Sequence, residues 1–130
     1  MMQENLPDIL ASLEFAAEQA GLGSWYFDIL AGTRWWSKTM YRLLGRDPSL
    51  GIPNDEELIE LVDPEDQELL RYSLQQIAQG QAPEAVDFRT RPGGTPVRVL
   101  RQSVRAETDP AGNGLKFYGS ILDVTELRQQ

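Results

Sequence analysis

The side chains of this chain that could do chemistry are carboxylates and arginines, because its 130 residues include no histidine and no cysteine. Imidazole proton shuttles, thiolate nucleophiles and thiolate or imidazole metal sites are therefore excluded. An enzyme built from this sequence would need a carboxylate such as Asp28 or Asp87 as general base, with its pKa raised in an apolar cavity. The sequence offers no paired acid and base, so we expect no catalytic residues.

The longest acidic stretch, residues 55–68, contains no basic residue. Its carboxylates lack the Asp-x-Asp-x-Asp-Gly spacing of a calcium-binding loop. Acidic residues near a helix start interact favourably with the positive end of the helix dipole. We therefore expect solvated helix faces and helix caps in this stretch, and no metal site.

The arginines concentrate in segments of strand-like composition in the second half of the chain. They are Arg89, Arg91, Arg98, Arg101 and Arg105. An inward-facing guanidinium could bind a carboxylate through two hydrogen bonds, and Arg89 is the arginine that we expect to point inward. The alternative is cross-strand pairing with Asp87 or Glu107 on an exposed face.

Composition and charge limit the class of protein. A chain of this length most simply forms one domain, and its net charge of −8 argues against binding a nucleic acid backbone. No apolar run approaches the roughly 20 residues of a membrane-spanning helix. The N-terminus has neither the basic nor the apolar region of a signal peptide. We expect a cytoplasmic protein with no membrane contact.

The periodicity of apolar residues divides the chain into helices and strands. Residues 7–20 predict a narrow amphipathic helix suited to packing against a sheet or a partner helix. Strands are expected over 22–29, 33–36, 84–91, 97–107 and 115–124, and helices over 37–45, 55–61 and 63–80. A last helix should begin at Thr125, with its hydroxyl as N-cap. We expect the 63–80 helix to bury one face through Leu69, Leu70, Leu74, Ile77 and Ala78.

Several short sequence motifs occur in an order that resembles a PAS domain. The first half carries Gly23-Ser24-Trp25, Trp36-Ser37, Tyr41-Arg42-Leu43-Leu44-Gly45 and Asp63-Pro64-Glu65-Asp66. The second half carries Asp87-Phe88-Arg89, Gly94 with Arg98, Gly119 and Asp123-Val124-Thr125-Glu126. The chain is most similar to the bacterial sensory-box subtype, which begins Gly-Ser-Trp and ends Asp-Ile/Val-Thr-Glu. It departs from that subtype at Asp63, where a histidine is usual, and an aspartate caps a helix at least as well.

The resemblance implies an α+β fold: a five-stranded antiparallel sheet with short helices on one face. Residues 1–20 would form an N-terminal amphipathic helix, residues 21–124 the PAS domain, and residues 125–130 the start of a linker helix. It also implies a non-enzymatic sensory or relay module of a bacterial signalling protein. A covalently linked C-terminal effector, of the histidine kinase or diguanylate cyclase type, would follow.

The resemblance also implies a set of site residues. A small ligand could bind between sheet and helices, although large aromatic residues such as Trp35 more often form core. Asp123 would anchor the end of the sheet and, with Thr125, relay a signal. A homodimer would use the first helix and the outer face of the sheet. Pocket candidates are Trp25, Phe27, Trp36, Met40, Leu44, Phe88, Arg89, Phe117 and Ile121; the dimer helix presents Leu13, Ala16, Ala17 and Ala20.

Cofactors known in PAS domains are disfavoured by the residues present. Haem would lack a histidine ligand and leave Met40 as the soft ligand outside the N-terminus. The photoactive flavin-binding PAS domains need a cysteine. They also have a glutamine that recognises the flavin ring, at the position where this chain has Ile121. An unknown small ligand remains possible. The alternatives are a ligand-free PAS assembly module with a filled core and, less favoured, a small carboxylate-dependent enzyme.

Overall fold

The computed structural model describes residues 5–93 and 96–128. It consists of a five-stranded sheet and several helices. The predicted order of elements is confirmed, with short 3-10 turns added at η2 (Pro48–Leu50) and η3 (Pro64–Asp66). Gly94, part of the predicted turn before the fourth strand, lies outside the described residues. The helices are α1 (Leu6–Gln19), α2 (Lys38–Leu44), α3 (Asp55–Glu60), α4 (Gln67–Ala78) and α5 (Thr125–Arg128); the strands are β1 (Leu22–Asp28), β2 (Thr33–Trp36), β3 (Val86–Arg89), β4 (Val99–Thr108) and β5 (Gly114–Asp123).

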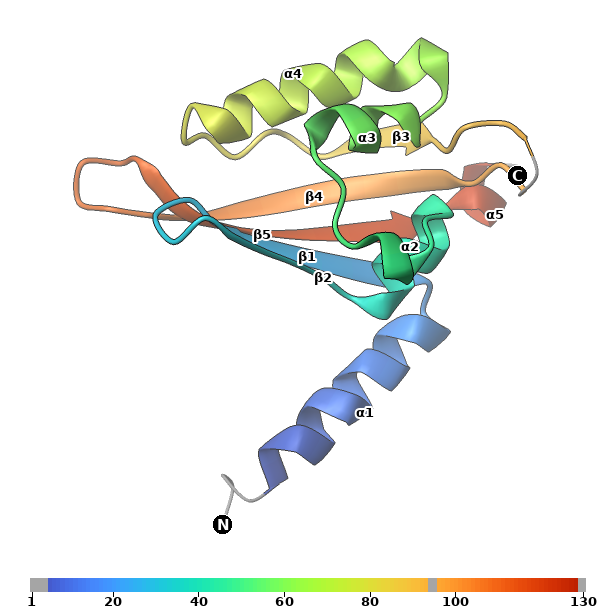
Figure 1. Ribbon diagram of the computed structural model, residues 1–130, viewed down its shortest axis with the longest axis horizontal. Helices are drawn as coiled ribbons and strands as arrows, with labels where there is room; N and C mark the ends of the chain where they lie inside the picture. The colour runs from blue at the N-terminus through green and yellow to red at the C-terminus, as the bar shows by residue number, and fades with distance from the viewer. Residues whose placement is uncertain (1–4, 94–95, 129–130) are drawn as a thin grey trace.

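The last strand of the chain lies at the centre of the sheet. The strand order is β2-β1-β5-β4-β3, and every neighbouring pair is antiparallel. β5 therefore pairs with β1 on one side and β4 on the other, over almost its whole length. Helices α2, α3 and α4 lie over one face of this sheet, and the core lies between them and the strands (Figure 1). The predicted α+β fold is confirmed.

Helix α1 stands away from the sheet rather than packing on it (Figure 1). None of its residues is buried, and Leu13 is 61% exposed. The chain turns out of this helix at Gly21, whose φ of 68° is readily adopted by glycine. The sequence predicted that this helix packs against either a sheet or a partner helix. The structure rules out packing on the face of its own sheet.

Helix α2 is held against β1 by a serine and a glycine. The Ser37 hydroxyl accepts hydrogen bonds from the backbone N–H of Met40, as N-cap, and from the backbone N–H of Ser24 on β1. A Cβ added to Gly23 would lie 2.9 Å from the Met40 Cα, so only glycine permits this close approach. The sequence Gly23-Ser24 and the cap Ser37 thus place α2 directly on the sheet.

The acidic stretch forms helix caps, as predicted. Asn54 and Glu57 form a capping box at the start of α3, and the Asp63 carboxylate accepts the backbone N–H of Glu65 in η3. The predicted buried face of α4 is confirmed at Leu70 and Ile77 but is wrong at Leu69, which is 39% exposed, and at Ala78, which is also exposed. Ser73 is buried instead. The segment predicted as one helix starts with the 3-10 turn η3, and the α-helix begins at Gln67.

Arg89 does not point inward as predicted. Its guanidinium donates to the Asp66 carboxylate at 3.0 and 3.1 Å and to Glu65 at 3.0 Å. Asp66 also accepts the Arg89 backbone N–H at 2.8 Å. β3 is an edge strand, so its outward-facing arginine can reach around to the acidic turn η3. The pair fastens the end of β3 to the start of α4.

This pair predicts a pH-dependent contribution to stability. The Arg89 guanidinium, opposed by partial burial, holds the pKa of Asp66 below its usual range. A lowered pKa in the folded state stabilises the fold above the ordinary aspartate pKa, and the contribution is lost as pH falls through the lowered value. Asp66→Asn keeps an acceptor for the backbone N–H of Arg89 and should cost about 1–2 kcal/mol at neutral pH. In urea unfolding the stabilities of the two proteins should converge as the pH falls through the lowered pKa of Asp66; a difference independent of pH would contradict this account.

Candidate functional site

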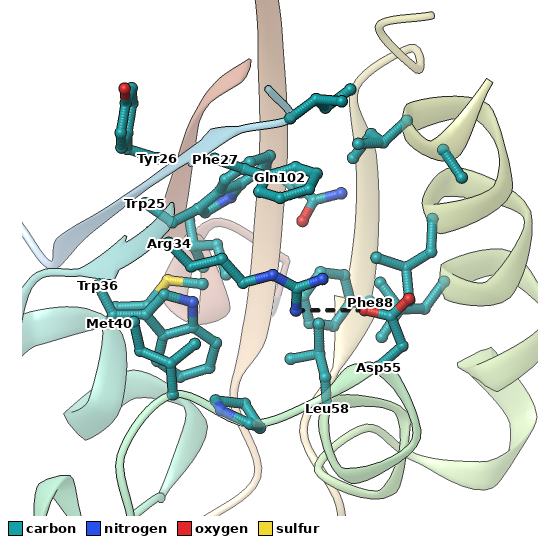
Figure 2. Close-up of a pocket in the computed structure, with 18 residues that line it drawn as sticks. Trp25, Tyr26, Phe27, Arg34, Trp36, Met40, Asp55, Leu58, Phe88 and Gln102 are labelled. Carbon is teal, nitrogen blue, oxygen red and sulfur yellow. Dashed lines mark ion pairs between the residues drawn. The ribbon is translucent and has the colours of Figure 1, made fainter. Parts of the chain in front are cut away.

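A cavity of about 240 Å³ lies between the inner face of the sheet and helices α2, α3 and α4. Figure 2 shows its walls, which come from all of these helices and from β1, β2, β3, β4 and β5. Most of the lining is apolar. The lining residues are Trp25, Tyr26, Phe27, Ile29, Arg34, Trp36, Met40, Ile52, Pro53, Asp55, Leu58, Leu70, Leu74, Ile77, Ala78, Phe88, Gln102 and Ile121. Six of the nine predicted pocket residues are among them.

One aromatic wall depends on a glycine in the central strand. Trp25 and Gly119 are opposite each other on β1 and β5. A Cβ at Gly119 would lie 1.9 Å from the Trp25 ring, so the indole lies directly over the backbone of β5. Phe27 follows on the same face of β1, as the alternation of the strand predicts. Gly119 therefore gives the Trp25 ring the space that a side chain would fill.

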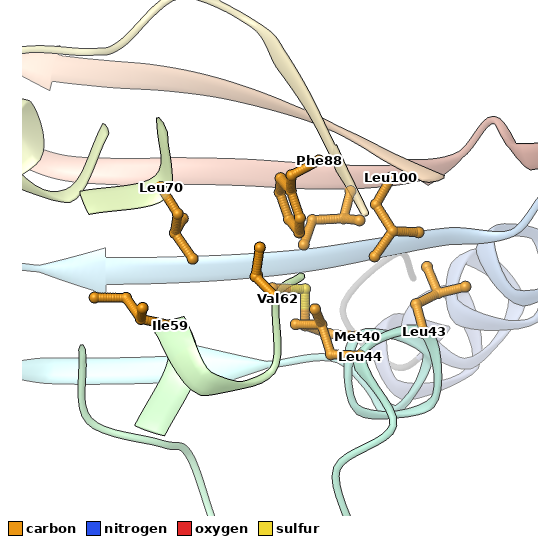
Figure 3. Close-up of a cluster of buried hydrophobic side chains, with 9 residues drawn as sticks. Met40, Leu43, Leu44, Ile59, Val62, Leu70, Phe88 and Leu100 are labelled. Atoms are coloured by element: carbon orange, nitrogen blue, oxygen red, sulfur yellow. The ribbon is translucent and has the colours of Figure 1, made fainter. Parts of the chain in front are cut away.

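The floor of the cavity is continuous with the hydrophobic core. Met40, Leu70, Phe88 and Ile121 line the cavity and are also members of the buried cluster. Figure 3 shows Met40, Leu70 and Phe88 packed with Val62 and Leu100 between the strands and helices. Because close-packed interiors transmit small displacements, a molecule in the cavity would press directly on core side chains.

Gln102 is the polar side chain set deepest in the cavity wall. It lies on β4 opposite Ile121 of β5 and Val86 of β3, and it is 7% exposed. Its amide makes no side-chain hydrogen bond within residues 5–93 and 96–128. Every fully enclosed side-chain nitrogen or oxygen among those residues has a partner, so the Gln102 amide borders the open space of the cavity. Figure 2 shows the Gln102 side chain among the residues that line the cavity.

An ion pair spans the mouth of the cavity. The Arg34 guanidinium on β2 lies 3.6 Å from the Asp55 carboxylate at the start of α3, and both side chains are partly exposed. The same guanidinium lies over the Phe27 ring, 4.9 Å from its centroid. Figure 2 shows this pair crossing between the strand side and the helix side of the pocket. Arg34 and Asp55 thus connect the two sides through side chains alone.

Three predicted pocket residues lie elsewhere. Arg89 pairs with η3, as described above. Leu44 lies one turn after Met40 on the same face of α2, is buried in the core and lines a separate hollow with Leu61 and Arg98. Phe117 is fully buried near the start of β5, where its ring lies against Gly114. Leu44 and Phe117 have the apolar character of lining residues, but their positions along the helix and the strand place them outside the cavity.

Sequence reasoning missed the polar residues of the pocket. Arg34, Asp55 and Gln102 were not proposed as lining residues, although Gln102 carries a visible signal. It follows Leu100 by two residues on β4, and such residues share one face of a strand, so a strand with Leu100 inward must also place Gln102 inward. For Arg34 and Asp55 no comparable signal exists, because they meet through the packing of β2 against α3.

The carboxylates considered as general bases lack the required environment. Asp28 accepts the Ala31 backbone N–H in the β1–β2 turn, which lowers its pKa. Hydrogen bonds from the Arg101 guanidinium lower the pKa of Asp87. A general base in an apolar cavity would have a raised pKa instead. Neither residue lines the cavity, so the geometry does not support Asp28 or Asp87 as a general base.

The junction after β5 joins three segments of the chain. The Asp123 carboxylate accepts the backbone N–H of Thr125 at 3.0 Å and its hydroxyl at 2.6 Å. The Thr125 hydroxyl accepts the backbone N–H of Val99 on β4 at 2.9 Å. The prediction that the Thr125 hydroxyl caps α5 is therefore wrong. Asp123 satisfies the first N–H of the helix, because the Thr125 hydroxyl is already committed to β4.

Two arginines extend this junction to neighbouring elements. Arg98 lies 3.8 Å from the Asp123 carboxylate and also donates to the backbone carbonyl of Leu43 at 3.4 Å, near the end of α2. Arg128 of α5 pairs with Asp87 on β3 at 2.6 Å, and Arg101 pairs with the same carboxylate at 2.8 Å. The cross-strand pairing of Arg101 with Asp87 confirms that alternative for one arginine of the strands.

Two further kinds of site were sought in the part of the chain that the structure describes. It contains no group of three or more acidic, histidine or cysteine side chains placed to hold a metal ion. None of its helices combines the length and the apolar character that crossing a membrane requires.

Comparison with known families finds no family model that matches the chain. Among curated proteins, the chain is 25% identical over 122 residues to the probable diguanylate cyclase DgcE of Escherichia coli (strain K12). That match covers 93% of the chain but only 11% of DgcE. The chain therefore spans a small part of the length of the curated relative that it matches.

Several solved structures have the same fold as this chain. The N-terminal domain of a diguanylate cyclase with a PAS/PAC sensor from Marinobacter aquaeolei has a TM-score of 0.65 at 20% identity, over 84% of this chain and 99% of that one. A sensory box histidine kinase/response regulator from Burkholderia thailandensis E264 has a TM-score of 0.63 at 20% identity, over 90% of this chain and 87% of that one. These likenesses show that the chain has the fold of a PAS domain.

Proposed function

We propose that this chain is a PAS sensory module of a bacterial signalling protein that binds a small molecule in the cavity between sheet and helices. The observation that carries this proposal is the cavity itself, about 240 Å³ lined by aromatic and aliphatic side chains with a few polar groups. Ligand pockets in proteins typically have this composition, at volumes of roughly 300–1,000 Å³. The cavity is slightly smaller than that range and therefore suits a molecule of one or two rings.

The cavity is connected to the junction after β5 by a single strand. Ile121 lines the cavity, and Asp123 lies two residues further along β5 on the same face. Met40 lines the cavity from α2, and Arg98 contacts both the end of α2 and Asp123. A ligand that displaces Met40 or Ile121 would therefore act on groups that hold α5. Asp123 and Thr125 are the residues that we propose as the relay.

The proposed relay through Asp123 and Thr125 leads to α5. A covalently linked effector of the histidine kinase or diguanylate cyclase type would receive the signal through this helix. A cytoplasmic location fits the domain's chemistry, since it needs no disulfides. The absence of histidine and cysteine from the sequence disfavours haem and a cysteine-adduct flavin as the bound molecule.

We also propose a homodimer through α1 and the outer face of the sheet. Helix α1 exposes apolar side chains, Leu10 and Leu13 among them, at 55% and 61%. The outer face of the sheet adds Trp35 and Tyr118, at 45% and 41% exposed. Covering such surfaces is favourable because it removes apolar area from water. This surface also favours the second candidate function, a module that acts through assembly alone.

The ligand proposal predicts a small molecule bound to the purified protein. Native mass spectrometry should detect an added mass on the wild-type chain. Leu74→Trp, which places a larger ring at a cavity-lining position of α4, should lose that mass while remaining folded. Leu69→Trp, on the exposed side of the same helix, is the matched control and should retain it. Equal occupancy in the two variants would show that the molecule binds elsewhere, and no added mass in the wild type would favour the assembly function.

The relay proposal predicts that Asp123→Ala loosens the start of α5. Amide hydrogen exchange at Thr125 should accelerate at least about tenfold, because its acceptor is removed. In the full-length protein, output should no longer respond to the stimulus while the PAS core remains folded. Asp109→Ala, in the β4–β5 loop, removes another carboxylate that accepts backbone N–H groups and should leave the response intact. Regulation that survives Asp123→Ala would contradict the relay.

The dimer proposal predicts that association depends on α1. Leu13→Glu should shift the protein from dimer to monomer in sedimentation at micromolar concentration, because a charge would be buried in the interface. Leu50→Glu, at an exposed leucine in η2, should not change the mass. A wild-type chain that stays monomeric at all concentrations, with its effector attached, would refute the dimer.

A further inference from the structure

The Arg34 guanidinium occupies a position for a cation at the mouth of the cavity. It lies near two groups that attract positive charge, the Phe27 ring, 4.9 Å from its centroid, and the Asp55 carboxylate at 3.6 Å. All three residues line the cavity, and Figure 2 shows the guanidinium reaching across it from the strand side. The resident side chain thus indicates which chemistry this part of the lining accepts.

Arg34 is held loosely at this position. Its distance to Asp55 is longer than the roughly 2.7–3.2 Å of an N–H···O hydrogen bond, whereas Arg89 and Arg101 lie 3.0 and 2.8 Å from their carboxylates. The Arg34 and Asp55 side chains are 42% and 54% exposed. Exposed ion pairs contribute little net free energy, because water competes for both charges. Arg34 can therefore turn outward into water and leave Phe27 and Asp55 to another cation.

The surroundings of this position favour a cation over an anion. Aromatic faces carry partial negative charge, and Trp25 and Trp36 also line the cavity. The first turn of α3 adds Glu56 and Glu57 to Asp55, in a chain whose net charge is −8. Such a field concentrates cations and repels anions. A charged ligand is therefore expected to replace Arg34 rather than Asp55.

The resident guanidinium also indicates the shape of that cation. A guanidinium is flat, donates N–H groups in a fork that matches both oxygens of a carboxylate, and stacks on aromatic rings. An ammonium is a compact charge that is hydrated more strongly, so it loses more on leaving water. The rest of the lining, with Met40 and Leu58, is largely apolar and suits an apolar body attached to the cation.

We propose that the cavity binds a small organic cation, an amidinium or guanidinium group on an apolar body, which takes the place of Arg34. The inference rests on the proposed function, because it assigns a ligand class to the same cavity. Asp55 receives the cation, Phe27 supplies the ring face, and Arg34 moves out to solvent. The side-chain connection between β2 and α3 then opens when the ligand binds.

The test compares three probes of one shape on the wild-type chain. Benzamidinium, benzamide and benzoate each carry a planar head group on a phenyl ring, and they are cationic, neutral and anionic at neutral pH. In an NMR titration, benzamidinium should bind at least about tenfold more tightly than benzamide, because its charge strengthens the contacts with the Phe27 ring and with Asp55. Benzoate should bind most weakly of the three.

Removal of the resident cation should improve the site. Arg34→Gln keeps a polar side chain on β2 but no longer competes with the ligand, so benzamidinium should bind about two- to fivefold more tightly than to the wild type. Arg105→Gln removes the same charge opposite Tyr118, on the outer face of the sheet, and should bind benzamidinium as the wild type does. Weaker binding to Arg34→Gln would mean that Arg34 itself recognises the ligand, and the proposal would be wrong.

Removal of the receiving carboxylate should have the opposite effect. Asp55→Asn should lower the affinity for benzamidinium to about that for benzamide. Glu56→Gln removes the same charge one residue later in α3, where the side chain pairs with Arg71 at 3.1 Å and does not line the cavity, and it should keep the preference for the cation. An unchanged preference in Asp55→Asn would contradict the proposal. The comparison of probes on the wild-type chain stands even if a variant does not fold.

The outcomes separate the ligand class from the function of the cavity. Equal binding of benzamidinium and benzamide to the wild type would overturn the cation inference and leave ligand binding in place. Tightest binding of benzoate would overturn it in favour of acid recognition by Arg34. If no probe binds but the wild-type chain carries an added mass in native mass spectrometry, the cation inference alone fails. If there is neither, the proposed ligand binding fails with it.

Discussion

The structure depends on the pairing of β5 with strands on both of its sides. The strand is continuous from Gly114 to Asp123, and it carries a cavity wall in its middle and the junction to α5 at its end. Gly119 allows the Trp25 ring to lie on it, and Gly23 on the adjacent β1 allows α2 to approach. Two glycines thus determine how closely the aromatic wall and the helix approach the central strands. A side chain at either position would separate layers whose contact defines the cavity.

The cavity combines a rigid floor with an adjustable mouth. Its floor consists of buried core residues such as Leu70 and Phe88, whereas its mouth is an exposed ion pair between β2 and α3. Exposed ion pairs contribute little to stability, typically 0–1 kcal/mol, so Arg34 and Asp55 can separate at small cost. Gln102 lies in the cavity wall on β4 and adds a polar side chain to a mostly apolar lining.

The elements of the fold could be predicted from local signals, but much of the site could not. Ser37 and Gly45 delimit α2 in the sequence as in the structure, because caps depend on neighbouring residues alone. Arg89 was assigned to the wrong face, because the position of β3 at the sheet edge is not encoded in its own residues. Thr125 was assigned a capping role, because its bond to Val99 joins positions 26 residues apart. The Arg34–Asp55 pair was missed for the same reason, since it forms only through tertiary packing.

Helix α5 is attached to the sheet at two places on different strands. Its first residue is bonded to β4 through Val99, and Arg128, one turn later, is bonded to β3 through Asp87. Two separate attachments fix a direction as well as a position. If β3 and β4 shear by a fraction of an ångström relative to each other, the helix must pivot about Thr125. A movement too small to be seen in the sheet would then be amplified with distance along any rigid rod that continues the helix.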